Sequence, residues 1–425
     1  MKAYKKRIAD DILRQRLEAR GAILLEGAKW CGKTSTAAQI AKSVLYMQDP
    51  AETKQYFAMM DMNPLELLKG KTPRLIDEWQ LAPRLWDAVR FEVDQRGEFG
   101  QFILTGSAVP ADISQIMHTG TGRIARMMMR PMTLLESGES TGQVSLGALF
   151  EGETDISGKT DMELDELAFV IARGGWPQAL GRSDSVALQQ AADYFDAVVN
   201  MDISRVDDIE RNPDRAVRLL RAYARSIGTQ IKFASIARDI EANEASRVSD
   251  ATVYSYISAL KKIFVLEESP AWTPNLRSKT PVRTTETRYF TDPSIAVAAM
   301  GLGPRDLMKS LHTMGFFFEN MAVRDLRVYA EAIGGKVYHF LDKNALECDA
   351  VVHLRNGAYG LIEVKLGGER LIEEGAKSLE RLASKLDITR MNPPAFKMVL
   401  TGLGPYAYKR KADDVLVVPL ACLRP

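Results

Sequence analysis

A glycine-rich motif that follows a short apolar run constrains this chain more than any other feature. The apolar run covers residues 22–25, and residues 27–34 read G-A-K-W-C-G-K-T, which fits the pattern G-x-x-x-x-G-K-T. Apolar residues then recur at helical spacing over 35–42, so the motif is predicted to join a buried strand to a helix. A loop in this context closes its backbone N–H groups around phosphate oxygens.

The residue types in the motif match the needs of a bound nucleoside triphosphate. Gly27 and Gly32 let the backbone approach the β-phosphate, and Lys33 reaches the β- and γ-phosphate oxygens. The Thr34 hydroxyl is a ligand for Mg²⁺, and Ser35 at the start of the helix completes the predicted nucleotide-binding set. The sequence therefore predicts ATP and Mg²⁺ as cofactors. A purely structural glycine turn would leave the Lys-Thr pair unexplained.

Two further apolar runs end in polar residues that suit the same chemistry. Residues 75–76 lead into Asp77, predicted to lie in the Mg²⁺ shell, and Glu78, predicted to activate the attacking water. Residues 102–104 lead into Thr105-Gly106-Ser107, where a hydroxyl could sense the γ-phosphate. Taken alone, L-I-D-E is common at helix and strand ends, and T-G-S also fits a polar turn after a core strand.

The order of these motifs resembles that of the AAA-type prokaryotic P-loop ATPases whose C-terminal domain of unknown function is similar to the PD-(D/E)xK restriction-endonuclease-like superfamily. The matching segments are G-A-K-W-C-G-K-T, L-I-D-E-W-Q-L-A-P, F-I-L-T-G-S, G-R and P-M-T-L-L-E, and the resemblance covers nearly the whole chain. It implies that Ser107 is the first sensor. It also implies that Arg123 places a positive charge on the γ-phosphate, in cis or from a neighbouring subunit. Arg126 and Arg130 remain alternatives for that role.

Composition and charge limit the partners. The chain has 425 residues, which predicts two to four domains, and its 56 Lys and Arg nearly balance its 55 Asp and Glu. Any nucleic-acid contact must therefore come from a local patch. Residues 151–210 hold 14 acidic and 4 basic residues, whereas residues 211–290 hold 14 basic and 8 acidic residues. This asymmetry predicts different neighbours for adjoining modules.

The sequence also predicts the compartment in which the protein is found. The sequence has no run of about eighteen apolar residues, so we expect no membrane span. The three cysteines, Cys31, Cys348 and Cys422, are far apart and fit a reducing compartment. The sequence therefore predicts a cytoplasmic protein.

The predicted fold class is α/β, with four parts. Residues 1–150 form a P-loop NTPase core with a parallel sheet, 151–210 a helical lid, 211–300 a winged helix and 301–425 a restriction-endonuclease-like α/β domain. The Gly- and Ser-containing stretch 137–159 is predicted to be a connector with little packing. The sequence G-G-W-P at 174–177 resembles the glycine-proline motif of the lid in such ATPases, which approaches the nucleotide.

The winged-helix prediction rests on three short amphipathic segments. The first carries a basic face formed by Arg215, Arg218, Arg221 and Arg225, the second covers 233–241, and the third begins at Ser249. A strand-like stretch at 279–290 follows. Phosphate neutralisation by these arginines would allow contact with DNA. The alternative is a winged helix that only packs against the lid.

The C-terminal part has the pattern of a metal-dependent phosphodiesterase. A helix over 315–329 is followed by strands over 336–341, 347–354 and 359–365, in the last of which Glu363 and Lys365 share one face. Asp349 and Glu363 are predicted to hold Mg²⁺, and Lys365 to position or deprotonate the attacking water. The superfamily's pattern implies that Glu319 completes the metal shell. A helix over 371–386 and strands over 396–401 and 415–420 complete an αβββαβ core. E-x-K alone is also common on solvated faces.

The predicted function is that of an ATP-binding, ATP-hydrolysing protein. Nucleotide would close the lid, move the winged helix and present the distal domain to DNA. One alternative is an active ATP-dependent DNA nuclease. Another is a signalling switch with little turnover that acts by assembly with partners, including a homo-oligomer. Composition does not separate these three.

Overall fold

The computed structural model describes residues 4–207, 209–244, 247–275, 277 and 281–425. The chain forms two compact units, each assembled from separate stretches of sequence. The first unit contains residues Met1–Pro131, Ala197–Asn212 and Ser258–Val265. The second unit contains residues Met132–Asp196, Pro213–Ile257 and Leu266–Pro425. The first unit thus leaves out residues 132–150, which the sequence assigned to the ATPase core, and takes in two later segments.

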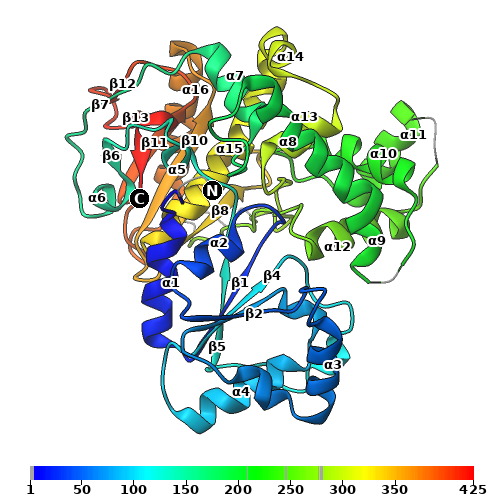
Figure 1. Ribbon diagram of the computed structural model, residues 1–425. Helices are drawn as coiled ribbons and strands as arrows, with labels where there is room; N and C mark the ends of the chain where they lie inside the picture. The colour runs from blue at the N-terminus through cyan, green and yellow to red at the C-terminus, as the bar shows by residue number, and fades with distance from the viewer. Residues whose placement is uncertain (1–3, 208, 245–246, 276, 278–280) are drawn as a thin grey trace. The chain divides into compact units, whose positions relative to one another are not determined.

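A five-stranded parallel sheet forms the centre of the first unit, with strand order β2-β3-β4-β1-β5. The strands are β1 (Ala22–Glu26), β2 (Ser43–Tyr46), β3 (Arg74–Asp77), β4 (Phe102–Gly106) and β5 (Ile124–Met128) (Figure 1). The helices are α1 (Ile8–Ala19), α2 (Lys33–Ala38), α3 (Thr53–Met62) and α4 (Leu85–Arg96). Strands β1 and β4 are almost fully buried, as expected of a parallel sheet covered on both faces. The predicted parallel sheet is confirmed.

Short helical turns connect and extend this unit. Three are 3₁₀ turns, η1 (Pro64–Leu68), η2 (Trp79–Leu81) and η3 (Ile113–Gln115). The later segments contribute a π-helical turn, η4 (Val198–Asp202), the short helix α9 (Ile203–Arg205) and the last residues of α12 (Asp250–Lys262).

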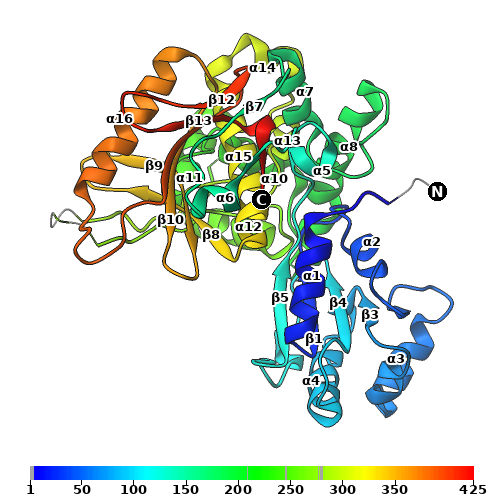
Figure 2. The same ribbon diagram turned by 90° about the vertical axis from the view of Figure 1, so that its left-hand side faces the viewer.

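The second unit is built on a seven-stranded mixed sheet with strand order β7-β12-β13-β11-β10-β9-β8. Its main elements are α15 (Leu311–Ala332), β8 (Gly335–Leu341), β9 (Glu347–Leu354), β10 (Tyr359–Lys365), α16 (Glu369–Lys385), β11 (Phe396–Thr401), β12 (Tyr406–Lys409) and β13 (Leu416–Pro419). Helix α16 buries Leu379 and Leu382 in a cluster with Val351 and Leu361 of the sheet, and α15 covers the other face (Figure 2). The predicted αβββαβ order of elements is present. Its assignment to the restriction-endonuclease-like superfamily stays a prediction.

The predicted connector at 137–159 is wrong. This region contains α5 (Leu134–Ser137), β6 (Val144–Ser145), α6 (Leu146–Phe150) and β7 (Gly158–Lys159). Strand β7 pairs with β12, and β6 pairs with β14 (Leu423–Arg424). Val144, Leu146 and Leu149 are buried. The glycines and serines form tight turns between short apolar elements, and these elements pack against the C-terminal part of the chain.

The three predicted helices of the middle region are present as α10 (Pro213–Ala224), α11 (Phe233–Glu244) and α12. The predicted strand-like stretch begins at residue 279, and residues 278–280 lie outside the described residues. Its described part, from residue 281 on, forms isolated antiparallel bridges, between Val282 and Asp342, between Leu266 and Phe290 and between Ser269 and Thr287. Two arginines of the predicted basic face make contacts within the protein. Arg221 donates to the Ala299 carbonyl, and Arg225 pairs with Asp239 at 2.6 Å. The winged helix and its contact with DNA stay predictions.

The remaining helices of the second unit are α7 (Leu164–Arg173), α8 (Asp184–Ala197), α13 (Pro293–Ala299) and α14 (Pro304–Lys309), with a 3₁₀ turn η5 (Leu420–Cys422) near its end. Across the part of the chain that the structure describes, no helix combines the length and the apolar character needed to cross a membrane.

Candidate functional site

The loop between β1 and α2 adopts a backbone that requires glycine. Gly27 has φ of 153° and Gly32 has φ of 102°, both in the region that L side chains rarely adopt. A Cβ atom on Gly27 would lie 2.1 Å from the carbonyl oxygen of Met129, which follows β5. Trp30 also has positive φ, 64°, although it carries a side chain. Strain of this kind is typical of loops shaped for a ligand.

Lys33 lies inside this loop. Its Nζ donates hydrogen bonds to the carbonyl oxygens of Gly27 at 2.9 Å and Ala28 at 2.8 Å, and the side chain is only 5% exposed. The ammonium charge is therefore held in the space that the loop encloses, where phosphate oxygens would bind. Ser35 lies in α2, and its side chain is exposed.

Asp77 and Thr34 are brought together as the sequence predicted. The Thr34 hydroxyl donates to Asp77 Oδ1 at 2.7 Å, and the Thr105 hydroxyl donates to the same oxygen at 2.6 Å. Gln48 Nε2 donates to Asp77 Oδ2 at 2.7 Å. A hydroxyl and a carboxylate side by side are the oxygen donors that Mg²⁺ prefers, so these residues fit the predicted ion. Gln48 was not predicted from the sequence. The feature that could have indicated it is its place shortly after the apolar run that forms β2, where a polar side chain can reach the carboxyl edge of the sheet.

Glu78 and Ser107 form a second pair at the same edge of the sheet. The Ser107 hydroxyl donates to Glu78 Oε2 at 2.9 Å, and Gln80 Nε2 donates to the same oxygen. Glu78 has φ of 58°, a strained value for a residue with a side chain. The carboxyl ends of β3 and β4 therefore place a carboxylate and a hydroxyl next to each other, one residue beyond the Asp77 cluster.

The three candidate arginines lie at different positions along β5, from its amino end to its carboxyl end. Arg123 precedes β5, its carbonyl accepts from Ala22 N at the start of β1, and its side chain pairs with Asp94 at 2.6 Å. It lies at the amino end of the parallel strands, whereas the loop lies at the carboxyl end. Its predicted action on the γ-phosphate in cis is therefore wrong, and action from a neighbouring subunit stays a prediction.

The two other arginines lie farther along β5. Arg126 pairs with Glu26 at 3.2 Å. Arg130 follows β5 at the loop's edge of the sheet, and its carbonyl accepts from Arg7 at 2.9 Å.

The predicted residues of the second unit also converge, around a lysine. Lys365 Nζ lies 2.7 Å from Glu363 Oε2 and 3.3 Å from Asp349 Oδ2, and Asp349 Oδ2 also accepts from Val364 N at 2.7 Å. Burial and the Asp349 carboxylate raise the pKa of Glu363 to about 8, against the opposing effect of Lys365. Glu363 is buried, and its Oε1 has no hydrogen-bond partner.

Two further glutamates lie near this carboxylate site. Glu319 of α15 accepts from the Tyr289 hydroxyl at 2.6 Å, and burial and the Asp349 charge raise its pKa well above the usual value. Glu347 accepts from Gln230 Nε2 at 3.1 Å, and burial and Asp349 raise its pKa as well. Sequence reasoning missed Glu347, although it lies two residues before Asp349 and so on the same strand face.

The metal site that the sequence predicts at Asp349, Glu363 and Glu319 stays a prediction. No group of three or more His, Cys, Asp or Glu side chains is placed to hold a metal ion anywhere in the described residues. The Lys365 ammonium instead pairs with both carboxylates that the sequence assigned to Mg²⁺.

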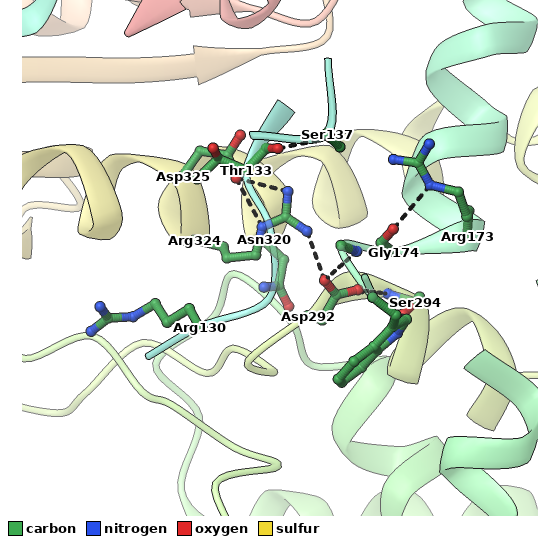
Figure 3. A network of polar contacts seen from close by, with 12 residues as sticks. Arg130, Thr133, Ser137, Arg173, Gly174, Asp292, Ser294, Asn320, Arg324 and Asp325 are labelled. Carbon is green, nitrogen blue, oxygen red and sulfur yellow. Dashed lines mark hydrogen bonds and ion pairs between the residues drawn. The ribbon is translucent and has the colours of Figure 1, made fainter. Parts of the chain in front are cut away.

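A buried polar network fixes the G-G-W-P turn within the second unit (Figure 3). Asp292 Oδ2 accepts from Gly175 N at 3.0 Å and from Arg324 of α15 at 2.6 Å. Asp325, the next residue of α15, accepts from Leu134 N at 2.9 Å. The turn is therefore attached to α15 through buried charges, and its predicted approach to the nucleotide stays a prediction.

Comparison with known proteins places the loop in a described family of domains. Residues 19–137 match the model of an AAA domain. This match supports a P-loop ATPase domain. The ATPase domain contains the loop, the Asp77 cluster and the Glu78–Ser107 pair, so the match and the geometry agree on ATP binding. Residues 164–306 and 314–423 match two domains of unknown function, DUF8612 and DUF4143.

Proteins similar to most of this chain are known. An uncharacterized protein of Mycobacterium tuberculosis and one of Mycobacterium bovis are each 23% identical over 360 residues, which cover 83% of this chain and 72% of each relative. A solved structure of a Walker-type ATPase of Pyrococcus abyssi is 16% identical, with a TM-score of 0.43. That match covers 70% of this chain and 96% of the other. The assignment of the ATPase domain rests on the AAA match and on the site.

Proposed function

We propose that this protein binds ATP with Mg²⁺ in the loop at residues 27–34 and hydrolyses it. The proposal is carried by one observation. The Thr34–Asp77 hydrogen bond of 2.7 Å and the Ser107–Glu78 hydrogen bond of 2.9 Å lie at the carboxyl edge of the sheet that also carries the loop. The residues proposed as metal ligands and as the base therefore lie at one edge of the sheet, beside the loop proposed to bind phosphate, which supports the proposal.

Each residue then has a distinct task. Thr34 would bind Mg²⁺ directly and Asp77 would complete its shell, oriented by the hydroxyl of Thr105. The ion supplies positive charge to the phosphate oxygens. Glu78 takes the proton of the attacking water, and the hydrogen bond from Ser107 orients the Glu78 carboxylate. The arginine that stabilises the γ-phosphate is Arg126 or Arg130 in cis, or Arg123 from a neighbouring subunit, which requires a homo-oligomer.

Two substitutions separate binding from hydrolysis. Lys33→Ala removes the ammonium from the loop, so both calorimetric binding of ATP and phosphate release should be lost. Glu78→Gln should keep ATP binding and lower phosphate release at least about 100-fold, the usual size of a general-base effect. Lys54→Ala, on the exposed surface of α3, serves as the control. Full turnover in Lys33→Ala would reject the site.

A second candidate function belongs to the C-terminal domain. The αβββαβ order and the convergence of Asp349, Glu363 and Lys365 favour hydrolysis of DNA phosphodiesters, with the middle helices contacting DNA. The unpartnered Glu363 Oε1 is a buried oxygen available for a further interaction. Supercoiled plasmid incubated with the protein, ATP and Mg²⁺ or Mn²⁺ tests this function, with Glu363→Gln as the control. Plasmid that stays intact with the unsubstituted protein would reject it.

A further inference from the structure

Asp202 lies against the phosphate-binding loop, although it comes long after residue 137, where the AAA match ends. Asp202 Oδ1 is 2.6 Å from Nζ of Lys29, the third residue of the G-A-K-W-C-G-K-T motif. The Asp202 side chain is 10% exposed and the Lys29 side chain 43% exposed. Both residues belong to the first compact unit.

We propose that Lys29 and Asp202 form a charge-neutralising pair at the nucleotide site. Lys29 neutralises the Asp202 carboxylate, which would otherwise repel the triphosphate that the neighbouring loop receives. The proposal rests on ATP binding at the loop and adds a residue from outside the AAA match.

Several contacts stabilise the segment that follows Asp202. Asp202 ends the π-helical turn η4, a rare conformation that is often found at functional sites. Arg211 is 4% exposed, donates to the Ile203 carbonyl at 2.8 Å and pairs with Asp207 at 2.6 Å. The Arg211 backbone N–H donates to the Ser204 hydroxyl at 3.0 Å. These contacts join Arg211 to Ile203, Ser204 and Asp207 within the segment that follows Asp202.

The same segment is also linked to the loop that follows β4, which contains Ser107. Lys262, the last residue of α12, pairs with Asp207 at 3.5 Å, and its carbonyl accepts from Val109 N at 2.9 Å. Val109 lies two residues after Ser107, the candidate sensor. The segments 197–212 and 258–265 therefore contact the phosphate-binding loop through Lys29 and the sensor loop through Val109.

The direction of the effect on nucleotide affinity distinguishes this charge neutralisation from an ordinary surface ion pair. Removing the Lys29 charge leaves Asp202 as an unpaired, largely buried carboxylate beside the triphosphate, and like charges repel strongly where water is scarce. Removing both charges abolishes this repulsion. A purely structural pair would change thermal stability in each single variant, without a preferred effect on nucleotide affinity.

Calorimetry with Mg²⁺ and a non-hydrolysable ATP analogue, on the full chain, tests the proposal. Lys29→Met should raise the Kd about tenfold, the equivalent of about 1.4 kcal/mol. Asp202→Asn should stay within about threefold of the unsubstituted protein, and so should Lys29→Met combined with Asp202→Asn. The matched control is Lys69→Met, because Lys69 forms a 2.6 Å pair with Glu66 before β3, at the opposite edge of the sheet.

Steady-state ATP hydrolysis gives a second readout. Lys29→Met should raise KM about tenfold and change kcat less than about threefold, and Lys29→Arg should restore KM because it keeps the charge. If Lys29→Met does not fold, Lys29→Gln takes its place with the same expectation. Unchanged affinity in the Lys29 variants, or a double variant as weak as Lys29→Met, would overturn the proposal. Absence of binding by the unsubstituted protein would instead reject the ATP site itself.

Discussion

Asp77 shows how single residues prepare the nucleotide site. Its carboxylate is 2% exposed, and such a group is costly to bury unless hydrogen bonds satisfy it. Thr34, Thr105 and Gln48 supply those bonds from three different elements. All three donors are neutral groups, so they orient the carboxylate without forming an ion pair with it. That arrangement suits a divalent cation better than a structural ion pair.

The raised pKa of Glu363 leads to a prediction about how the stability of the protein depends on pH. Its pKa of about 8 in the folded protein lies above its ordinary value of 4.5, so the folded state binds the proton more tightly than the unfolded state. Stability from this group is complete below about pH 4.5 and is lost as the pH rises toward 8. Thermal unfolding followed between pH 5 and pH 8.5 should show a falling midpoint. Glu363→Gln, which stays neutral, should show a smaller fall.

The size of this effect is on the order of a few kcal/mol, because each pKa unit corresponds to about 1.4 kcal/mol and Lys365 is coupled to the same carboxylate. The exposed Glu374, which pairs with Arg370, provides the control. Glu374→Gln should keep the pH profile of the unsubstituted protein. Identical profiles for the unsubstituted protein and Glu363→Gln would show that Glu363 is not protonated in the folded state.

The residues of the nucleotide site divide into those that the sequence predicts and those that it does not. Lys33 and Thr34 follow from a motif of fixed spacing, and Asp77 meets them because parallel strands bring their carboxyl ends to one edge. Gln48 and Asp202 follow no motif. Their positions depend on a short strand and on a distant segment that returns to the loop, and tertiary packing alone decides both.

At the scale of elements, periodicity predicts the long helices and strands of the C-terminal domain. It fails for β7, which has two residues, and for the short elements between 137 and 159. Two-residue strands have no measurable alternation, so their pairing is set by the neighbouring β12 rather than by their own sequence. The placement of Arg123 fails for a different reason. A motif gives the identity of a residue but not the end of the strand at which it lies.

The network around Asp292 supports a prediction about element packing. Asp292 links the turn at Gly175 to Arg324 of α15, and both charged side chains are almost fully buried. Asp292→Asn should lower the free energy of unfolding by about 2–4 kcal/mol, because Arg324 then keeps only Asp325 as a carboxylate partner. Urea unfolding followed by circular dichroism measures the change. A loss below about 0.5 kcal/mol, the size expected for exposed pairs, would show that the network contributes little.

At the scale of the whole molecule, the division of the chain differs from a simple succession of modules. The sequence predicted four consecutive parts, because boundaries were placed where composition changes. Contacts define two units instead, and the first takes back 197–212 and 258–265 after the chain has left it. Composition cannot show such returns, since a segment of eight to sixteen residues is too short to have a distinct charge or hydropathy.

Because residues 197–212 and 258–265 belong to the first unit, we expect the ATPase domain to be less stable when it is shortened to residues 1–137, where the AAA match ends. Val198, Val199 and Ile203 in the first segment and Ile263 and Val265 in the second are all buried. A buried side chain of this size contributes about 1.5–3 kcal/mol, and a domain is stable by only about 5–15 kcal/mol in total. A fragment of residues 1–137 should therefore unfold at a lower temperature than the full chain and bind a dye specific for exposed apolar surface. A fragment of residues 1–212 should recover part of the loss. A 1–137 fragment that melts cooperatively at the temperature of the full chain would contradict this, because the returning segments would then add nothing to the domain that they contact.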